Sequence, residues 1–296
     1  MLDFSVVSTV CLFDSVRSSS EGMAAVEMNN KWGYYNKKGE LIVPCVYDMF
    51  SFSTGHEDAF NFPEELAKVK INKKWGFINK EGTLIIPCVY EKAFNFSEGL
   101  AAIEMDGFGF INKEDVLIIP CVYNFARSFS EGLASVKMKD KWGYINKEGE
   151  LIIPCIYDWA DSFSEGMAKI KMNEKCGFIN KAGVVIIPCV YDMAWSFSQG
   201  MAAIELNNKW GYINKAGELI IPFIYDKADS FSEGLAKVEI NKKYGFINKP
   251  GELIILCVYS HADWFFKGLA NVQTFDSNGW SKRGYINKEG IAYWED

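Results

Sequence analysis

Hydrophobic and polar positions alternate along the chain in short segments that return about every 34 residues. The segment LAKVEI, residues 235–240, places Ala, Val and Ile between Lys and Glu. This period of two predicts a half-buried β-strand with one face in the core and the other in solvent. A polar turn such as 241–243 leads to a second apolar segment of the type KWGYIN, and another turn leads to a third, ELIIPCVYD. The pattern predicts three short strands in each repeat.

One glycine marks the register of the repeat, since it follows the same aromatic place in every copy: Gly33, Gly76, Gly109, Gly143, Gly177, Gly211, Gly245 and Gly284. The two longer steps between these glycines indicate loop insertions at about 54–59 and 275–281. We expect a single domain, 1–296, with a divergent amino-terminal cap strand in 1–20. The eight repeats are expected at about 21–50, 64–93, 98–126, 131–160, 165–194, 199–228, 233–262 and 267–296.

The second and third strands carry the clearest signature of the repeat, in Trp32, Gly33, Trp75, Gly76, Trp142, Gly143, Trp210 and Gly211. An invariant glycine inside a strand predicts a bulge or a close approach by a neighbouring backbone or ring. The turn before the third strand reads Asn-Lys-x-Gly, and Pro250 before Gly251 predicts a type II turn with positive φ at the second central residue, a region that Asp115 also tolerates. The proline inside the third strand predicts a bend or a sheet edge.

Each repeat closes with a segment of the type YDxAxxFSEG, as in 157–166. It is short and rich in turn-forming residues, which predicts a compact loop or a single turn and a low helical content for the chain.

These motifs, in fixed order and over nearly the whole chain, resemble the bacterial WG repeat family, also called KWG repeats. The resemblance implies a β-rich repeat protein with an interaction role, and it implies no catalytic residues. The chain departs from the family pattern locally, with Cys176 and Arg283 at the tryptophan place and Leu256 at the proline place.

A unit of this length cannot bury its apolar face alone, so neighbouring units must stack. We therefore expect an all-β fold of about eight three-stranded units stacked as a twisted β-solenoid. A closed toroid or propeller is the alternative arrangement.

The charge balance limits the class of partner. The chain has 31 basic and 38 acidic residues, and a net charge of −7 gives no attraction to nucleic acid or anionic lipid. Apolar runs are too short for a membrane span, which predicts no membrane insertion. The amino end lacks the basic start of a signal peptide, and we expect a cytoplasmic location.

Cysteine also recurs at one repeat position, in Cys11, Cys45, Cys88, Cys121, Cys155, Cys189 and Cys257. Phe223 takes this position in the remaining copy, which indicates a small packing residue rather than a metal ligand or disulfide partner. We interpret Cys176, at a different repeat position, in the same way.

A catalytic site needs unlike residues that converge at one place, and the repeat offers like residues at regular intervals. The two histidines, His56 and His261, have no recurring partner and are expected in loop or surface roles. The sequence therefore predicts no catalytic residue, no metal site and no cofactor.

Carboxylates recur at two repeat positions, in Asp48, Glu91, Asp158, Asp192 and Asp226 and in Glu98, Glu131, Glu165 and Glu233. Glycosidase chemistry and calcium binding are open alternatives. We favour turn-forming or capping roles, because the residues repeat in nearly identical surroundings.

An Asn-Lys pair stands in all eight repeats. If the repeats stack in register, its lysines form a row that could recognise an acidic or polar partner: Lys37, Lys80, Lys113, Lys147, Lys181, Lys215, Lys249 and Lys288. The competing interpretation is that Asn makes the turn and Lys protects a sheet edge against aggregation.

The repeat count and the absence of a convergent polar site favour a non-enzymatic scaffold for protein–protein interaction or assembly. The alternative is a carbohydrate-binding or cell-wall-binding module that uses regularly spaced aromatic residues. We expect most aromatic side chains to fill the core between repeats.

Overall fold

The computed structural model describes residues 13–18, 24–36, 38–48, 62–275 and 279–294. It divides into two compact lobes. The first lobe contains 1–139 and 145–150, and the second contains 140–144 and 151–296. Strands account for nearly all regular structure, and the described residues contain a single short helix, the 3₁₀ helix η1 (Pro63–Glu65). No helix among these residues is both long and apolar enough to cross a membrane.

The first lobe contains three antiparallel sheets. One has the strands β1 (Ser15–Ser18), β2 (Ala24–Met28), β3 (Lys31–Tyr35) and β4 (Leu41–Tyr47). The next has β5 (Ala67–Ile71), β6 (Lys74–Ile78) and β7 (Leu84–Tyr90), and the third has β8 (Lys92–Ala93), β9 (Ala101–Glu104), β10 (Phe108–Ile111) and β11 (Leu117–Tyr123). The boundary between the lobes falls within the next strands, β12 (Phe125–Ala126), β13 (Ala134–Met138), β14 (Lys141–Ile145) and β15 (Leu151–Tyr157).

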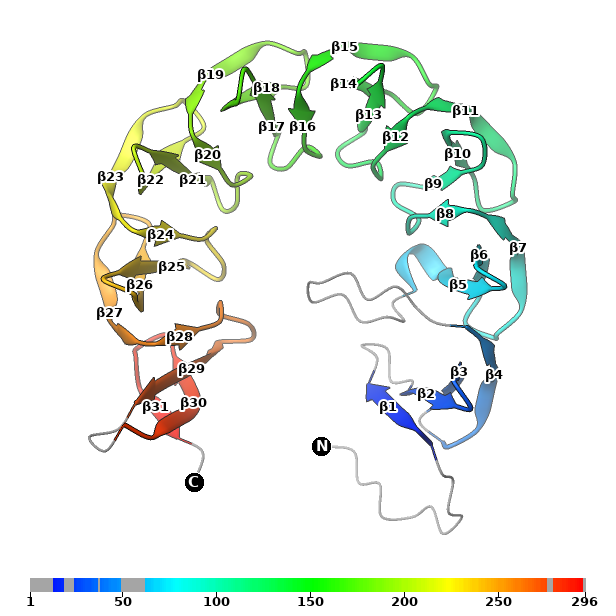
Figure 1. The fold of residues 1–296 in the computed structure, drawn as a ribbon, viewed down its shortest axis with the longest axis horizontal. Coiled ribbons are helices and arrows are strands. Elements are labelled where there is room, and N and C mark those ends of the chain that lie inside the picture. The colour runs from blue at the N-terminus through cyan, green and yellow to red at the C-terminus, as the bar shows by residue number, and fades with distance from the viewer. Residues whose placement is uncertain (1–12, 19–23, 37, 49–61, 276–278, 295–296) are drawn as a thin grey trace. The chain divides into compact units, whose positions relative to one another are not determined.

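The second lobe continues the same series with four sheets of four strands. The first two contain β16 (Trp159–Ala160), β17 (Met167–Met172), β18 (Lys175–Asn180), β19 (Val185–Tyr191), and β20 (Met193–Ala194), β21 (Met201–Leu206), β22 (Lys209–Asn214), β23 (Leu219–Tyr225). The last two contain β24 (Lys227–Ala228), β25 (Leu235–Ile240), β26 (Lys243–Asn248), β27 (Leu253–Tyr259), and β28 (His261–Ala262), β29 (Leu269–Phe275), β30 (Ser281–Asn287), β31 (Ala292–Trp294). Within this lobe the long strands β19, β23 and β27 follow one another along one side (Figure 1).

The expected three strands per repeat are present, but most sheets have a fourth. A two-residue strand, such as Lys227–Ala228, lies inside the segment expected to be a loop, and it pairs with the first strand of the following repeat. The three-stranded expectation was therefore wrong for the seven sheets in which the described residues include a fourth strand. Two residues are too few to show the alternation from which a strand is predicted.

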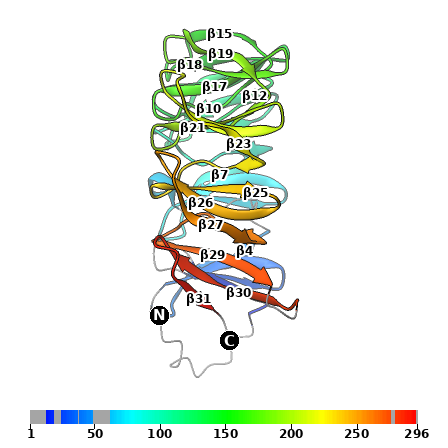
Figure 2. The ribbon, with the colours of Figure 1, turned by 90° about the vertical axis from the view of Figure 1, so that its left-hand side faces the viewer.

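Both faces of the first strand are covered, which corrects the expected solvent face. In β21, Ala202 and Ile204 pack in one core cluster with residues of the preceding sheet, while Ala203 packs in another with residues of the following sheet. In β25, Glu239 is buried although it lies on the face expected in solvent. The reason is that each internal sheet of the second lobe has a neighbour on both sides, and Figure 2 shows β25–β27 and β29–β31 as successive layers.

The invariant glycine lies at a break in register between the second and third strands. Trp210 pairs with Tyr225 and Tyr212 pairs with Ile221, so the third strand holds extra residues opposite Gly211. A Cβ atom on Gly211 would lie 2.5 Å from the carbonyl oxygen of Ile221. The two predictions for this glycine, a bulge and a close backbone approach, are both confirmed.

The third strand is an edge strand in every sheet of the second lobe, as the proline predicted for β19 and β23, and β27 and β31 lie at the edge without one. The turn that precedes it has the predicted positive φ, at +92° for Gly251 and +61° for Asp115. Its hydrogen bond, however, runs from the Gly251 N–H to the Asn248 carbonyl, which makes Lys249 and Pro250 the two central residues. The type II turn centred on Pro250 and Gly251 was therefore a wrong assignment, because Gly251 is the last residue of the turn and not one of its two central residues.

Candidate functional site

The asparagine of the Asn-Lys pair builds its turn with its own side chain. The Asn214 carboxamide oxygen accepts hydrogen bonds from the N–H groups of Ala216 and Glu218, each at 3.0 Å. Asn146, Asn180 and Asn248 repeat part or all of this pattern. The turn-making role expected for asparagine is confirmed.

The lysine of the pair reaches an acidic side chain that belongs to an earlier repeat. Lys215 Nζ lies 3.2 Å from Glu165, and the ammonium of Lys288 lies 2.9 Å from Glu233. The first lobe contains the equivalent pairs Lys113–Glu64 and Lys147–Glu98. Lysines of the predicted interaction row therefore join repeats to one another. Lys37 of this row lies outside the described residues.

The same glutamates hold the tight hairpin of the next repeat, in which Ser198 pairs with Met201 and Phe266 pairs with Leu269. The Gly200 N–H donates to the Glu165 carboxylate at 2.8 Å, and the Gly268 N–H donates to Glu233 at 3.0 Å. Burial opposes ionisation of Glu165, but the Gly200 N–H and Lys215 outweigh it and lower the pKa. Lys288 is the main cause that lowers the pKa of Glu233. These carboxylates are structural contacts between repeats.

The acidic residue after the repeat tyrosine makes a second bridge. Asp226 accepts from Lys209 of its own repeat at 2.6 Å and from the Asn241 N–H of the next repeat at 2.7 Å. Lys209 is the main cause that lowers the pKa of Asp226, and the Asn241 N–H acts in the same direction. Asp192 has the equivalent partners Lys175 and Asn207. The turn-capping interpretation of these carboxylates is confirmed.

A serine in each hairpin adds a third contact between repeats. The Ser198 hydroxyl donates to the Phe231 carbonyl at 2.7 Å, and the Ser164 hydroxyl donates to the Phe197 carbonyl at 3.0 Å. The carbonyl belongs to the phenylalanine of the following repeat, whose ring packs on the buried ring of the second strand, as Phe231 does on Tyr212. The polar groups that recur in the sequence are thus engaged in joining adjacent repeats.

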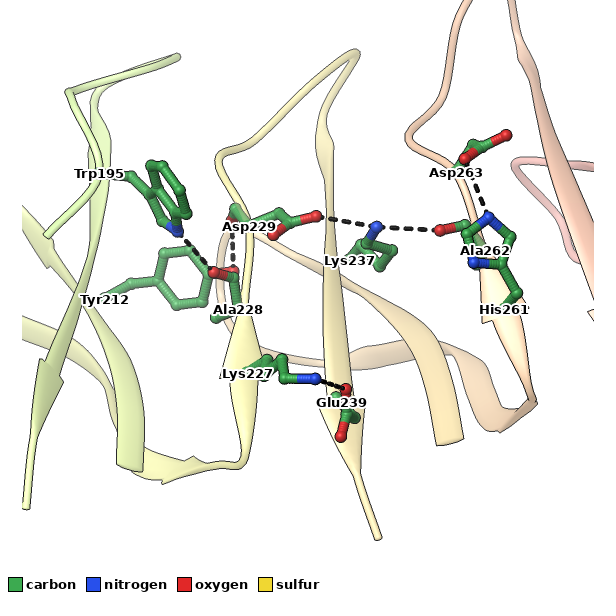
Figure 3. A network of polar contacts seen from close by, with 10 residues as sticks. All are labelled: Trp195, Tyr212, Lys227, Ala228, Asp229, Lys237, Glu239, His261, Ala262 and Asp263. Carbon is green, nitrogen blue, oxygen red and sulfur yellow. Dashed lines mark hydrogen bonds and ion pairs between the residues drawn. The ribbon is translucent and has the colours of Figure 1, made fainter. Parts of the chain in front are cut away.

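Two positions that differ between copies lie in the polar network around Lys237 of the first strand β25 (Figure 3). Lys237 pairs with Asp229 at 3.0 Å and donates to the Ala262 carbonyl of the next repeat at 2.9 Å. In the preceding repeat, the same two positions hold Ala203 and Trp195, and the Trp195 ring N–H donates to the Ala228 carbonyl at 3.0 Å. The lysine with the aspartate and the alanine with the tryptophan are alternative ways of filling one space.

The edge strands carry exposed apolar side chains in rows, a feature the sequence reasoning missed. Each third strand from β7 to β27 exposes two neighbouring apolar residues before the proline place and one after it, and β27 also exposes Leu256 at the place itself. In the second lobe the exposed members are Leu151, Ile152, Ile156, Val185, Ile186, Val190, Leu219, Ile220, Ile224, Leu253, Ile254, Leu256 and Val258, and the first lobe repeats the row in Leu84, Ile85, Val89, Leu117, Ile118 and Val122. The edge proline was the signal that could have predicted this exposure, because it marks a strand with a neighbour on one side only.

An open hollow of about 660 Å³ lies beside Cys176, between the sheet β16–β19 and strand β20. Trp159, Lys169, Lys171 and Met193 are among the residues that line it. Cys176 stands where the neighbouring repeats of this lobe have Trp142 and Trp210, both buried. The hollow is therefore associated with a missing ring, and sequence comparison of the copies singled out this position without predicting the space.

The remaining candidate residues have simpler surroundings. The described cysteines at the recurring position are half-buried free thiols, and Cys176 is a buried free thiol. Burial raises the pKa of Cys45 and Cys257.

His261 is exposed and lies 3.2 Å from Asp263. Cys11, His56 and the 54–59 insertion lie outside the described residues, as do 276–278 of the second insertion. Among the described residues, no group of three or more His, Cys, Asp or Glu side chains has a geometry that could hold a metal ion.

Solved structures similar to this chain have low identity to it. The extracellular domain of BT4673 from B. thetaiotaomicron is 12% identical with a TM-score of 0.37, and the alignment covers 96% of this chain and 48% of that one. KlHsv2 with loop 6CD replaced by a Gly-Ser linker is 7% identical with a TM-score of 0.38, covering 93% of each chain. The WD40 domain of Toxoplasma gondii coronin is 11% identical with a TM-score of 0.35, covering 67% of each. The chain spans about half the length of BT4673's extracellular domain.

Curated proteins give no match. The family described as WG containing repeat matches nine consecutive segments: 11–32, 32–55, 57–75, 75–107, 108–142, 142–176, 177–210, 210–244 and 244–274. These segments cover most of the chain and follow the tryptophan–glycine register seen in the strands. The chain belongs to the WG containing repeat family.

Proposed function

We propose that the protein is a non-enzymatic repeat scaffold that binds a protein partner through the apolar rows of its edge strands. The observation that carries the proposal is the exposure of large apolar side chains at the same strand positions in consecutive repeats, such as Leu219 at 49%, Ile220 at 41% and Ile224 at 53%. Single exposed apolar residues are ordinary, but gathered ones are typical of interaction surfaces.

The form of the edge favours recognition by side chains over addition of a strand. Pro222 lies in the middle of β23 and has no N–H to donate to an added strand. A partner would therefore pack apolar groups onto the row on either side of the proline. Repeats that present the same row let affinity accumulate over several weak contacts.

The carboxylates that could suggest catalysis support this proposal, because they are bound in contacts between repeats. Glu165, Asp192 and Asp226 form ion pairs and accept backbone N–H groups that belong to the following repeat. These contacts give each carboxylate a role in joining adjacent repeats. The lysine row remains a second part of the proposed surface, weaker because several of its ammonium groups are already paired. For the arrangement of the repeats we retain the twisted β-solenoid as our proposal.

A charge introduced into the row tests the proposal. The full-length double variant I220E/I224E should capture at least about tenfold less partner than the wild type, because two desolvated carboxylates would face an apolar surface. The variant A182E/A216E adds the same charge at exposed turn positions, where the repeat holds glutamate in other copies such as Glu81 and Glu148. It should capture as the wild type does.

The measurement is affinity capture with quantitative mass spectrometry, after circular dichroism has shown equal folding of the three proteins. A partner that is retained by I220E/I224E, or lost equally by A182E/A216E, contradicts binding through the row.

A second candidate, a carbohydrate-binding module, is favoured by exposed indole rings in the second lobe, among which Trp280 is 73% exposed. Trp159, Trp195 and Trp264 are exposed by 42%, 43% and 42%. An exposed ring flanked by polar side chains offers a stacking surface for a sugar. Binding on a glycan array that is lost in the triple variant W159A/W195A/W264A would support this candidate. No binding to any glycan or to cell-wall fragments removes it.

A further inference from the structure

The tryptophan place of the repeat faces the next sheet, and the side chain at this place normally fills the space between the two. Trp142 packs on Trp159 at 5.4 Å between ring centroids, and Phe108 packs on Phe125 at 4.8 Å. Cys176 occupies the same place on β18, and its short side chain leaves the hollow described above. Met193, at the position equivalent to Trp159 and Phe125, is 48% exposed and leaves the hollow open.

Two lysines beside the hollow have a counterpart elsewhere in the chain that shows what they contact. In the sheet β5–β7, the ammonium groups of Lys68 and Lys70 lie 4.6 and 5.0 Å from the ring centre of Trp75. Lysine over the face of an indole is a cation–π contact, and indole is the most favourable ring for it. Lys169 and Lys171 stand at the same two strand positions relative to Cys176.

The atoms around Lys169 repeat the arrangement around Lys68. Lys68 Nζ donates to the Ala93 carbonyl at 3.0 Å, and Lys169 Nζ donates to the Ala194 carbonyl, also at 3.0 Å. An additional ion pair with Asp161, at 2.9 Å, fixes Lys169 in this place. Its ammonium is therefore held where a ring at the tryptophan place would be contacted. Cys176 supplies no ring there, and the ring that Lys169 does contact is that of Trp195, whose centre lies 5.9 Å from Nζ.

The combination of two lysines is specific to these two repeats. At the same pair of positions the other described copies hold Ala25 and Glu27, Ala102 and Glu104, Ser135 and Lys137, Ala203 and Glu205, Lys237 and Glu239, and Asn271 and Gln273. Of the two repeats that have both lysines, the one with Lys68 and Lys70 has Trp75, and the one with Lys169 and Lys171 has the hollow beside Cys176.

We propose that the hollow beside Cys176 binds an electron-rich planar aromatic ring of about indole size, which takes the place of the missing side chain. Lys169 and Lys171 contact the ring face as cations, and Trp159 and Met193 contact it as apolar groups. Cavities left by a missing apolar side chain bind aromatic molecules of matching size in other proteins. The ring is either a free small molecule or the tryptophan side chain of a polypeptide. The inference does not depend on the proposed scaffold function.

The test is a titration of the full-length protein with free indole, in which binding is measured by calorimetry and by saturation-transfer NMR. One indole should bind per chain, and cyclohexanol, a soluble saturated ring without a π face, should bind at least about tenfold more weakly than phenol, its aromatic counterpart. The variant C176W restores the residue of the neighbouring repeats and should abolish binding while the fold is retained. Indole binding that survives in C176W, or equal binding of phenol and cyclohexanol, overturns the proposal, as does no binding of any aromatic probe.

A second variant keeps the test decisive if C176W folds poorly. Trp75→Cys opens the equivalent space between Lys68 and Lys70 and should raise the stoichiometry from one indole to two. The double variant K169M/K171M keeps much of the aliphatic length without the charges and should weaken indole binding about tenfold or more. An unchanged affinity in K169M/K171M contradicts the role of the cations.

The two sources of the ring are separated by comparing free indole with N-acetyltryptophanamide, in which the ring carries a polypeptide backbone. Tighter binding of the amide assigns the hollow to a tryptophan side chain of a partner. Tighter binding of indole assigns it to a free aromatic metabolite. Binding of neither probe overturns the proposal for both sources.

Discussion

The carboxylate of Glu165 accepts a hydrogen bond at 2.8 Å from the backbone N–H of Gly200, which lies 35 residues further along the chain. Glu165 adopts a φ of +55°, a region that costs a residue with a Cβ about 1–2 kcal/mol. Glu98 and Glu233 have the same conformation and the same type of acceptor role. The conformation recurs at this turn position even where the residue is Lys267, with a φ of +51°, and in the three glutamates it presents the carboxylate to the next repeat.

Substitutions at this glutamate should separate the ion pair from the hydrogen bond. Glu165→Gln keeps an acceptor for the Gly200 N–H but loses the ion pair with Lys215, and we expect a loss of about 0.2–1 kcal/mol in the free energy of unfolding. Glu165→Ala loses both contacts and should cost about 1 kcal/mol more. Urea unfolding followed by circular dichroism measures both variants. Equal stability of the alanine and glutamine variants would contradict the hydrogen-bonding role.

The chain contains its own control for the ion pair. Gln199 takes the glutamate position in one repeat, and its side-chain oxygen accepts the Gly234 N–H at 2.9 Å without a charge. Gln199→Glu should place a carboxylate at the position from which Glu165 reaches Lys215, here facing Lys249, and raise the unfolding free energy by a few tenths of a kcal/mol. The gain should vanish in the double variant Q199E/K249M. A gain of the same size in that variant would show that Lys249 is not the partner.

The glycine of the second strand should be far less replaceable than the hairpin glycine. A Cβ on Gly211 meets backbone atoms at 2.5 Å, so Gly211→Ala should cost about 3 kcal/mol or more, because the edge strand must shift. Gly200 has a φ of +85° with open space around the position of a Cβ, so Gly200→Ala should cost about 1–2 kcal/mol from backbone strain alone. Thermal and urea unfolding of the two variants measure the difference. Similar losses would show that contact with the edge strand is not the cause.

Acid should weaken the contacts between repeats. Asp192 and Asp226 have pKa values lowered below their ordinary value of 3.8, with the neighbouring lysine as the main cause in each, and Glu233 is lowered below 4.5 by Lys288. A group with a lowered pKa stabilises the fold above its ordinary pKa, and this contribution is lost as the pH falls through the lower folded value. Unfolding free energy measured between pH 7 and pH 3 should therefore stay level to about pH 5 and then fall.

The matched comparison for the acid titration is Asp226→Asn, which keeps an acceptor for the Asn241 N–H and does not titrate. Its stability should be lower than that of the wild type at pH 7 and should approach it near pH 3. A constant difference between the two proteins across this range would contradict the assignment to Asp226.

The repeat period, the bulged glycine and the asparagine turn could be predicted from the sequence, because each depends on a local backbone requirement that Gly211 or Asn214 satisfies within its own repeat. The two-sided burial of the first strand could not. Lys237 looks like a solvent residue in the sequence, and only the stacked sheet shows that Asp229 and the Ala262 carbonyl receive its ammonium group.

The edge rows and the hollow were missed for a related reason. An apolar segment such as LIIP predicts burial, and exposure of Ile220 depends on which sheet edge lacks a neighbour. The substitution at Cys176 is visible in the alignment of the copies, but the space it leaves depends on where Met193 of the next repeat lies. Contacts between repeats decide both features, and a pattern within one repeat does not contain them.

A last prediction concerns two equivalent pairs in adjacent repeats. One repeat has Trp195 with Ala203, and the next has Asp229 with Lys237. Both pairs fill the same space in adjacent repeats, so Ala203→Lys alone should place an ammonium group beside an indole with no carboxylate to receive it. Trp195→Asp alone should place a carboxylate beside alanine and lose the ring's hydrogen bond to the Ala228 carbonyl.

The double variant W195D/A203K recreates the lysine–aspartate arrangement of the neighbouring repeat, in which the two groups lie 3.0 Å apart. We expect it to be more stable than the sum of the single losses predicts, by about 0.5–1.5 kcal/mol. Urea unfolding of the wild type, both single variants and the double variant gives this coupling energy directly. Ala203→Ser with Trp195→Asp serves as the control, since serine is native to this position in Ser135 and carries no charge. Additive losses in W195D/A203K would show that the two positions do not depend on each other, and that each repeat tolerates its own pair for separate reasons.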